Sequence, residues 1–181
     1  MNFFVSHPSK KIKNSFNISG SKSESNRLLI LKHLLGNIEI NNLSDSDDTS
    51  VLHDSLSSKS RKIDVGHAGT AMRFLTSYLS IQENKSYEIY GSERMHNRPI
   101  KILVDSLNDL GADIKYLGKK GYPPLKINGK KLDKFNVQLD ANISSQYISA
   151  LILIAPSLKK GLVINLEGDI TSRPYIEMSL S

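Results

Sequence analysis

Residues 20–31, GSKSESNRLLIL, set a polar, glycine-led turn directly before an apolar helix. Apolar residues from Leu28 to Leu31 cover most sides of that helix, which predicts a helix buried inside the domain rather than an amphipathic one on its surface. The free amides and the dipole of a helix's first turn attract negative charge, and Gly20 permits a close backbone approach. The stretch therefore predicts a core element that begins at an anion-binding turn.

The same arrangement returns twice, so the chain contains three weak internal repeats. Each repeat predicts an apolar helix, a short strand, a polar turn and a second helix. The predicted helices and strands fall at residues 23–35, 38–40 and 51–56 in the first copy, 70–80, 87–89 and 100–110 in the second, and 144–155 and 162–164 in the third. The closing helix of the third copy has barely begun at Ser181.

A hairpin-like pair of strands is predicted between the second and third copies. Residues 114–116 and 125–127 alternate apolar and polar side chains around the turn at 121–124. The equivalent stretch after the first copy, residues 57–61, is short and polar, so we expect that copy to lack one or both strands. The predicted fold class is α/β, with three buried helices walled by sheet.

Composition favours one globular domain that binds an anion. The 181 residues are 39% hydrophobic and 23% charged, and the net charge of +6 favours anionic partners. Aromatic residues are only 7% and the basic residues are scattered, which favours small phosphorylated metabolites over nucleic acid. The absence of cysteine excludes disulfides and thiolate metal sites. With no apolar run of bilayer length and no export signal at the start, we expect a soluble, cytoplasmic protein without a membrane partner.

Candidate ligand-binding residues gather at the starts of the three apolar helices. The first start offers Lys22, Ser23 and Arg27, of which the last two share a helix face. The second offers the bare amide of Gly69, which suits a phosphate, and the third is the Ser-Ser-Gln run at residues 144–146. Any one of these segments is also typical of a capped helix with exposed cations. Three such starts in corresponding positions favour convergence on one ligand.

The second helices of two repeats begin with an arginine followed by proline, at residues 97–99 and 172–175. Arg98 is a strong phosphate candidate, because a guanidinium group matches phosphate oxygens bidentately. Arg173 is more typical of an arginine that solvates or pairs with a nearby acid. The acidic run SDSDD at residues 44–48 fits a capping and turn segment. Neither this run nor the five histidines show metal-ligand spacing, so we expect no metal.

Five motifs, in this order along the chain, resemble those of the 5-enolpyruvylshikimate-3-phosphate synthases, the target family of glyphosate. The motifs are Gly20-Ser21-Lys22-Ser23-x-Ser25-Asn26-Arg27, Ala68-Gly69-Thr70-Ala71-Met72-Arg73, Arg94-Met95-x-x-Arg98-Pro99, Ser144-Ser145-Gln146 and Ser172-x-Pro174-Tyr175. The resemblance spans nearly the whole chain. The UDP-N-acetylglucosamine enolpyruvyl transferases share the fold but lack the Lys-Ser-x-Ser-Asn-Arg pattern, and they are the alternative within the enzyme class. A nucleic-acid-binding module is the alternative outside it.

The resemblance implies one half of a two-domain inside-out barrel, built from βαβαββ units of which the third is incomplete. Residues 1–18 would belong with the other domain, and residues 19–181 would form the substrate-binding domain. It implies transfer of the carboxyvinyl group of phosphoenolpyruvate to the 5-hydroxyl of shikimate 3-phosphate in the shikimate pathway, without a cofactor. The catalytic acid and base would come from the missing carboxy-terminal domain, so this chain would bind substrate without turnover, and the complete enzyme would be monomeric.

The same resemblance implies two sets of substrate-binding residues. Those at the phosphate of phosphoenolpyruvate would be Lys22, Gly69, Arg98 and Gln146. Those at shikimate 3-phosphate would be Ser23 and Arg27 at its carboxylate, Ser144, Ser145 and Ser172 at its phosphate, and Tyr175 beside it. Two positions depart from the family pattern: His67 replaces a common asparagine, and Phe74 replaces a frequent proline. We expect the first to act on the phosphoenolpyruvate pocket and the second on the helix that carries Gly69.

Overall fold

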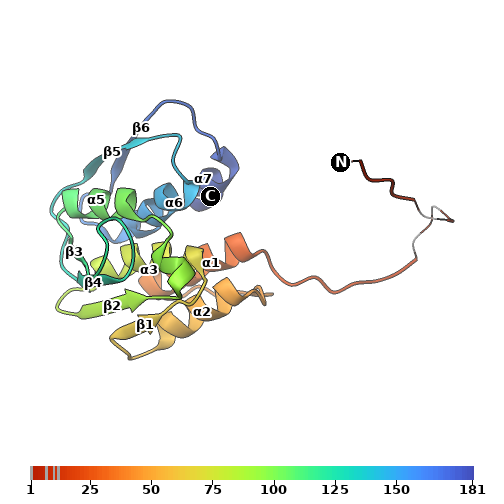
Figure 1. The fold of residues 1–181 in the computed structure, drawn as a ribbon, viewed down its shortest axis with the longest axis horizontal. Coiled ribbons are helices and arrows are strands. Elements are labelled where there is room, and N and C mark those ends of the chain that lie inside the picture. The colour runs from red at the N-terminus through yellow and green to blue at the C-terminus, as the bar shows by residue number, and fades with distance from the viewer. Residues whose placement is uncertain (1, 7, 10, 12) are drawn as a thin grey trace.

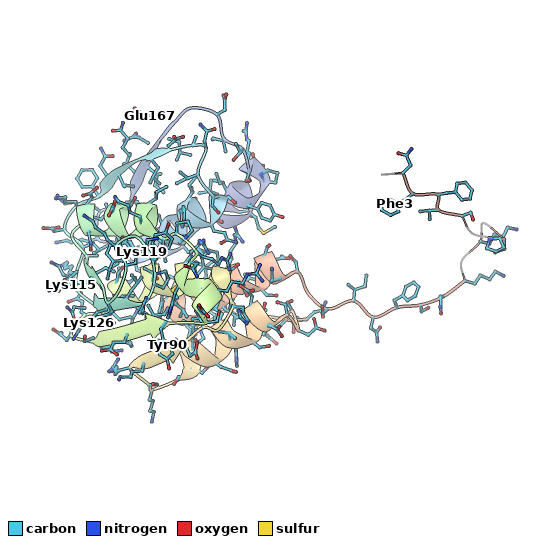
Figure 2. All side chains as sticks on the ribbon, in the orientation of Figure 1. Phe3, Tyr90, Lys115, Lys119, Lys126 and Glu167 are labelled. Carbon is cyan, nitrogen blue, oxygen red and sulfur yellow. The ribbon has the colours of Figure 1, made fainter. Side chains whose placement is uncertain are left out.

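The computed structural model describes residues 2–6, 8–9, 11 and 13–181. The described residues before position 20 form no helix or strand, and this segment runs away from the folded body (Figure 1). Figure 2 shows Phe3 on it, apart from the side chains of the body. Apolar side chains there are exposed, as with Phe4 at 94% and Ile18 at 80%. Positions 1, 7, 10 and 12, on which the expectation of an amino-terminal strand partly falls, lie outside the described residues.

The folded body alternates helices and short strands. The helices are α1 (Lys22–Leu35), α2 (Asp47–Ser57), α3 (Gly69–Ser80), α4 (Glu93–His96), α5 (Lys101–Asp109), α6 (Ser145–Ile154), the 3-10 turn η1 (Ala155–Ser157) and α7 (Arg173–Leu180). The strands are β1 (Lys62–Asp64), β2 (Ser86–Tyr90), β3 (Asp113–Tyr116), β4 (Leu125–Asn128), β5 (Asn136–Asp140) and β6 (Val163–Glu167). The α/β class predicted from the sequence is confirmed.

The first sheet has the strand order β1-β2-β4-β3. β1 runs parallel to β2, and β4 is antiparallel to both β2 and β3. The register places Ile89 between Ile63 and Leu125, and Ile114 opposite Ile127. These five side chains are buried and make one apolar face, which packs on α3 and α5. The β3–β4 pair is the predicted hairpin-like pair, so that prediction is confirmed.

The second sheet consists of β5 and β6, which pair in parallel. Parallel neighbours need a crossover, and α6 supplies it (Figure 1). The sequence analysis did not predict β5, although Val137 and Leu139 alternate with Asn136, Gln138 and Asp140 as in a half-buried strand. Only Val137 and Leu139 of this strand face the core.

Helices α3 and α6 form the centre of the core, as their apolar sequences predict. Nearly every residue of both helices is buried, and they pack against each other. Helix α1 packs against both but is only half covered, since Leu28 and Leu31 are partly exposed and Leu35 is 53% exposed. The prediction of three fully buried helices is therefore right for α3 and α6 and wrong for α1.

Helix α1 is exposed on one side because the strand predicted at residues 38–40 does not form. Gly36, at φ 79°, ends the helix, and residues 38–40 then run on without pairing to any described strand. The alternation of Ile38 and Ile40 suits a strand, but a strand needs a neighbour for its backbone hydrogen bonds. The predicted strand at 38–40 is wrong for this reason, and no described strand walls α1.

Candidate functional site

The amino ends of α1, α3, α6 and α7 face one pocket of about 320 Å³. The residues that line it are Lys22, Ser23, Arg27, Thr70, Ser144, Ser145, Gln146 and Tyr175. They come from segments far apart in the sequence. The structure brings the starts of α1, α3 and α6 together, as the sequence predicts. The described lining residues offer hydroxyl groups, an amide and two cations, and no carboxylate. Such a lining suits an anionic ligand that carries hydroxyl groups.

Two of these helices, α1 and α6, begin with a serine cap that leaves part of the first turn open. The hydroxyl of Ser21 accepts the amide of Glu24 at 3.4 Å, and that of Ser144 accepts the amide of Gln146 at 3.4 Å. Both caps leave other first-turn amides free for a ligand. The start of α3 has no such cap, since its N-cap residue is Ala68.

Arg27 lines the pocket but is held by the protein itself. Its Nη2 donates to Ser149 Oγ at 2.8 Å and to the Tyr175 carbonyl at 3.0 Å, and its Nε donates to Ser179 Oγ at 2.7 Å. Its Nη1 donates to the carbonyl of Ser23 at 2.7 Å. Burial lowers the pKa of Arg27 from its usual range. The residue therefore joins α1 to α6 and α7 and leaves little of its guanidinium free for a ligand.

Arg98 lies in a second pocket, also of about 320 Å³, with His67, Arg94 and Met95. Its Nη1 donates to the carbonyl of His67 at 3.3 Å, and the His67 ring is hydrogen-bonded to Ser92 Oγ at 2.8 Å. Burial lowers the pKa of Arg98, and the neighbouring cations Arg73 and Arg94 lower it further, while Asp48 opposes the shift. A concentration of positive charge of this kind favours a bound anion.

The first two residues of α3 join the two pockets. Gly69 packs directly against the Arg98 guanidinium, and Thr70 Oγ1 accepts a hydrogen bond from Gln146 Nε2 at 3.3 Å. The residues predicted to bind one phosphate are thus divided: Lys22 and Gln146 line the first pocket, and Arg98 lines the second.

The sequence analysis missed Arg73 as a residue that organises this junction. Arg73 is 7% exposed, and its guanidinium donates to the carbonyl of Gly69 at 2.8 Å and to that of Pro99 at 3.5 Å. It also lies over the Tyr147 ring, whose hydroxyl donates to the same Pro99 carbonyl at 2.7 Å. Its position four residues after Gly69 on the helix is the signal that could have identified it.

Only one of the three residues considered at the start of α7 lines the first pocket. Tyr175, 47% exposed, lines the first pocket, but Ser172 is the N-cap residue of α7 and lies outside the lining. Arg173 pairs with Glu177 at 2.8 Å on the exposed face of the helix, as predicted for an arginine without a ligand.

The sequence matches a known protein family over most of its length. The model of the EPSP synthase family, described as 3-phosphoshikimate 1-carboxyvinyltransferase, matches residues 52–181. The chain belongs to the EPSP synthase family.

Curated relatives match it over its whole length. A 3-phosphoshikimate 1-carboxyvinyltransferase of Bacteroides fragilis (strain YCH46) is 49% identical over 181 residues, which is 99% of this chain and 44% of the relative. One of Marinomonas sp. (strain MWYL1) is 37% identical over 206 residues, 99% of this chain and 48% of that protein. The chain therefore spans about half the length of the relatives it matches.

The fold is also that of solved EPSP synthase structures. An EPSP synthase from Acinetobacter baumannii superposes with a TM-score of 0.75 at 21% identity, covering 90% of this chain and 42% of that one. At this identity the likeness establishes the fold and nothing finer. The predicted enolpyruvyl transferase-like domain is confirmed.

The two departures from the EPSP synthase pattern lie in different surroundings. His67 is exposed and lines the Arg98 pocket. Phe74 is 1% exposed in the core, where Arg27 lies 5.5 Å from its ring centre. His67 thus borders the candidate site, and Phe74 packs against Arg27 from the core.

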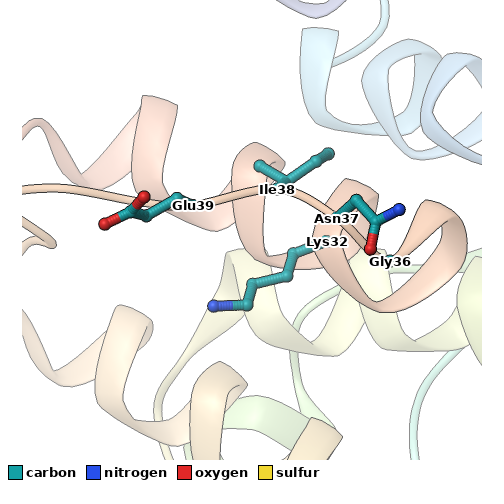
Figure 3. A pocket seen from close by; sticks show the side chains of 5 residues that line it. All are labelled: Lys32, Gly36, Asn37, Ile38 and Glu39. Atoms are coloured by element: carbon teal, nitrogen blue, oxygen red, sulfur yellow. The ribbon is translucent and has the colours of Figure 1, made fainter.

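A further pocket lies away from the predicted site residues. Figure 3 shows an open pocket at the carboxyl end of α1, lined by Lys32, residues 36–38 and Glu39, and it includes none of them. Over the described part of the chain, no three His, Asp or Glu side chains gather as a metal site requires. No described helix is long and apolar enough to cross a membrane.

Proposed function

We propose that this chain forms the substrate-binding wall of a 3-phosphoshikimate 1-carboxyvinyltransferase. The observation that carries the proposal is the meeting of four helix starts at one cationic, hydroxyl-rich pocket, beside a second pocket around Arg98. The activity is transfer of the carboxyvinyl group of phosphoenolpyruvate to the 5-hydroxyl of shikimate 3-phosphate. The relatives, both 3-phosphoshikimate 1-carboxyvinyltransferases, support the same reaction.

The first pocket is proposed to hold shikimate 3-phosphate. Ser144 and Ser145 offer hydroxyls at the start of α6 for its phosphate, with Ser172 nearby at the start of α7. Ser23 and Arg27 face its carboxylate, and Tyr175 packs beside the ring. Because Arg27 is engaged with Ser149 and Ser179, its contribution is one free N–H and its positive charge rather than a complete bidentate fork.

The phosphate of phosphoenolpyruvate is proposed to bind where the two pockets adjoin. Gly69 presents a backbone amide there, Arg98 supplies a guanidinium, and Lys22 and Gln146 reach in from the first pocket. Two anionic substrates repel each other, so fixed cations and amides must offset that repulsion before the carbon centres can approach. This offset is the chemical contribution of the chain.

The chain spans about half the length of its relatives. We propose that the catalytic acid and base lie in the half that it does not span, that residues 1–18 pair with that half, and that residues 19–181 are one domain. The complete enzyme is proposed to be a cytoplasmic monomer without a cofactor. The chain alone is then expected to bind substrate without turnover, and steady-state product formation by the purified chain would contradict this.

A titration observed by amide NMR tests the proposal. Shikimate 3-phosphate should shift the amides of Lys22, Arg27 and Ser145 together, and added phosphoenolpyruvate should then shift Gly69. UDP-N-acetylglucosamine, the substrate of the alternative enzyme, serves as the control ligand and should leave all four unchanged. A response to the nucleotide sugar alone, or scattered shifts without these residues, would exclude the proposed substrates.

A further inference from the structure

One member of the acidic run at residues 44–48 does not serve its own helix. Asp48, in the first turn of α2, extends to α3, where its Oδ1 accepts the Thr70 amide at 3.0 Å. Its neighbour Asp47 is exposed on the same turn, and its side chain makes no hydrogen bond or ion pair among the described residues. Two adjacent carboxylates with the same charge thus have different roles.

The start of α3 depends on this contact because it lacks a cap of its own. Ala68 has no side-chain hydrogen-bonding group, so the first-turn amides must find acceptors elsewhere. Asp48 takes the Thr70 amide, and within the described residues the amides of Gly69 and Ala71 have no acceptor. The carboxylate therefore occupies one amide and leaves the Gly69 amide, beneath Arg98, open.

The charges around Asp48 give the contact a second effect. The cations Arg73 and Arg94 both act on Arg98, and Asp48 is the carboxylate that acts on it in the opposite direction. A negative charge here reduces the mutual repulsion of the arginines while the anion site is empty. Once a phosphate is bound, the same charge opposes it, so the hydrogen bond and the charge of Asp48 affect anion binding in opposite directions.

We propose that Asp48 is a positioning residue of the phosphate site: its hydrogen bond to the Thr70 amide fixes the start of α3, so that Gly69 stays beneath Arg98 and Thr70 stays against Gln146. The inference rests on the proposed function only in naming the ligand as a phosphate. Asp48 itself touches neither the open Gly69 amide nor the Arg98 pocket lining.

Three variants of the chain separate the effect of the Asp48 hydrogen bond from that of its charge. Inorganic phosphate and phosphoenolpyruvate are the probes, and their binding is followed by NMR. Asp48→Ala removes both the acceptor and the charge, whereas Asp48→Asn keeps an oxygen acceptor of the same size and removes only the charge. Asp47→Ala is the matched control, because it makes the same charge change on the same turn of α2 without touching α3.

A ligand-free measurement comes first. In Asp48→Ala the hydrogen exchange of the Thr70 amide should rise about fivefold, as expected for a lost helix cap, and it should stay near the wild-type rate in Asp48→Asn and Asp47→Ala. Unchanged exchange in Asp48→Ala overturns the proposal, whatever the chain binds.

Ligand binding then tests the functional part. Asp48→Ala should bind either probe about fivefold more weakly than the wild type, since the Gly69 amide loses its fixed direction. Asp48→Asn should bind at least as tightly as the wild type. If Asp48→Asn bound the probes as weakly as Asp48→Ala does, the positioning role would be overturned. Equally weak binding by Asp47→Ala would overturn it too. If the wild type shows no response at Gly69, the proposed function fails, while Thr70 exchange still decides whether Asp48 holds α3.

Discussion

The guanidinium of Arg98 lies so close to the Cα of Gly69 that any side chain at position 69 would overlap it. The contact holds Arg98 over the first turn of α3, where the Gly69 amide has no acceptor among the described residues. A fixed cation and an open amide side by side form a preorganised pair of donors for one anion. Glycine is needed here for its small size, since its φ is not in the positive range.

Gly69→Ala should therefore displace Arg98 and weaken the binding of phosphoenolpyruvate or inorganic phosphate. Losing one charge-assisted hydrogen bond corresponds to roughly tenfold in the dissociation constant. The melting temperature should not fall much, because alanine is a better helix former than glycine. Calorimetric titration and a thermal melt of the same sample measure both effects.

Gly118→Ala is the matched control for that experiment. A methyl group there would meet only Pro124 at an ordinary 3.6 Å, and Gly118 lines neither pocket. Its phosphate affinity should equal that of the wild type. Equal affinities for Gly69→Ala and the wild type would show that Arg98 does not need its present position to bind the anion.

Arg27→Lys tests the network that joins α1 to α6 and α7. Lysine cannot reach Ser149, Ser179 and the Tyr175 carbonyl at once, so buried acceptors lose their donors. The free energy of unfolding should fall by about 2 kcal/mol, as measured in urea. Arg173→Lys, at an exposed pair with Glu177, should cost less than about 1 kcal/mol. Equal costs at the two positions would contradict the structural role of Arg27.

Tyr116 should make stability depend on alkaline pH. Burial raises the pKa of Tyr116 to about 12, with help from the Asp105 carboxylate, and its hydroxyl has no hydrogen-bond partner among the described residues. A raised pKa in the folded state means that the unfolded chain loses its proton first, so stability falls as the pH rises from about 10 to 12.

Tyr116→Phe keeps the ring and removes the titrating group. The variant should be at least as stable as the wild type at neutral pH, and its stability should fall less steeply above pH 10, where urea unfolding is compared at several pH values. Tyr122→Phe, on the loop beside Lys119, is the control for loss of a tyrosine hydroxyl. Parallel curves for Tyr116→Phe and the wild type would refute the assignment.

The sequence predicts the parts of this fold that rest on local pattern. Helices α3 and α6 could be predicted because they are apolar on most sides, and their starts because a glycine or a serine lies at each. The strand at 38–40 was wrong since alternation reveals a side-chain pattern but not whether a neighbouring strand exists. β5 also alternates but was missed, because two apolar positions do not reveal that a neighbour such as β6 pairs with them.

The same distinction between local pattern and packing applies to the candidate site. Helix starts are local, so their residues could be named from the sequence, whereas contacts between elements could not. The separation of Arg98 from Lys22 and Gln146, the contact of Arg73 with the Pro99 carbonyl, and the contact of Asp48 with Thr70 all depend on how different elements pack. Only their three-dimensional arrangement shows which residues share a ligand and which hold the others in place.

Removing residues 1–16 should leave the folded body intact. The described side chains Phe3, Phe4 and Phe16 are 81%, 94% and 72% exposed, so their deletion removes almost no buried apolar surface. The free energy of unfolding should change by no more than about 0.5 kcal/mol, and solubility should rise because exposed apolar side chains favour association.

The cut must spare the residues that hold α1. Asn42 donates to the carbonyl of Ile18 at 3.2 Å, and Ser21 caps the helix, so Ser21→Ala serves as the positive control, with an expected cost of about 1 kcal/mol. If deletion of residues 1–16 costs as much as that control, the segment belongs to this body, and the proposed pairing with the other half of the enzyme is wrong. If the cost is negligible, the exposed phenylalanines remain available for a partner sheet.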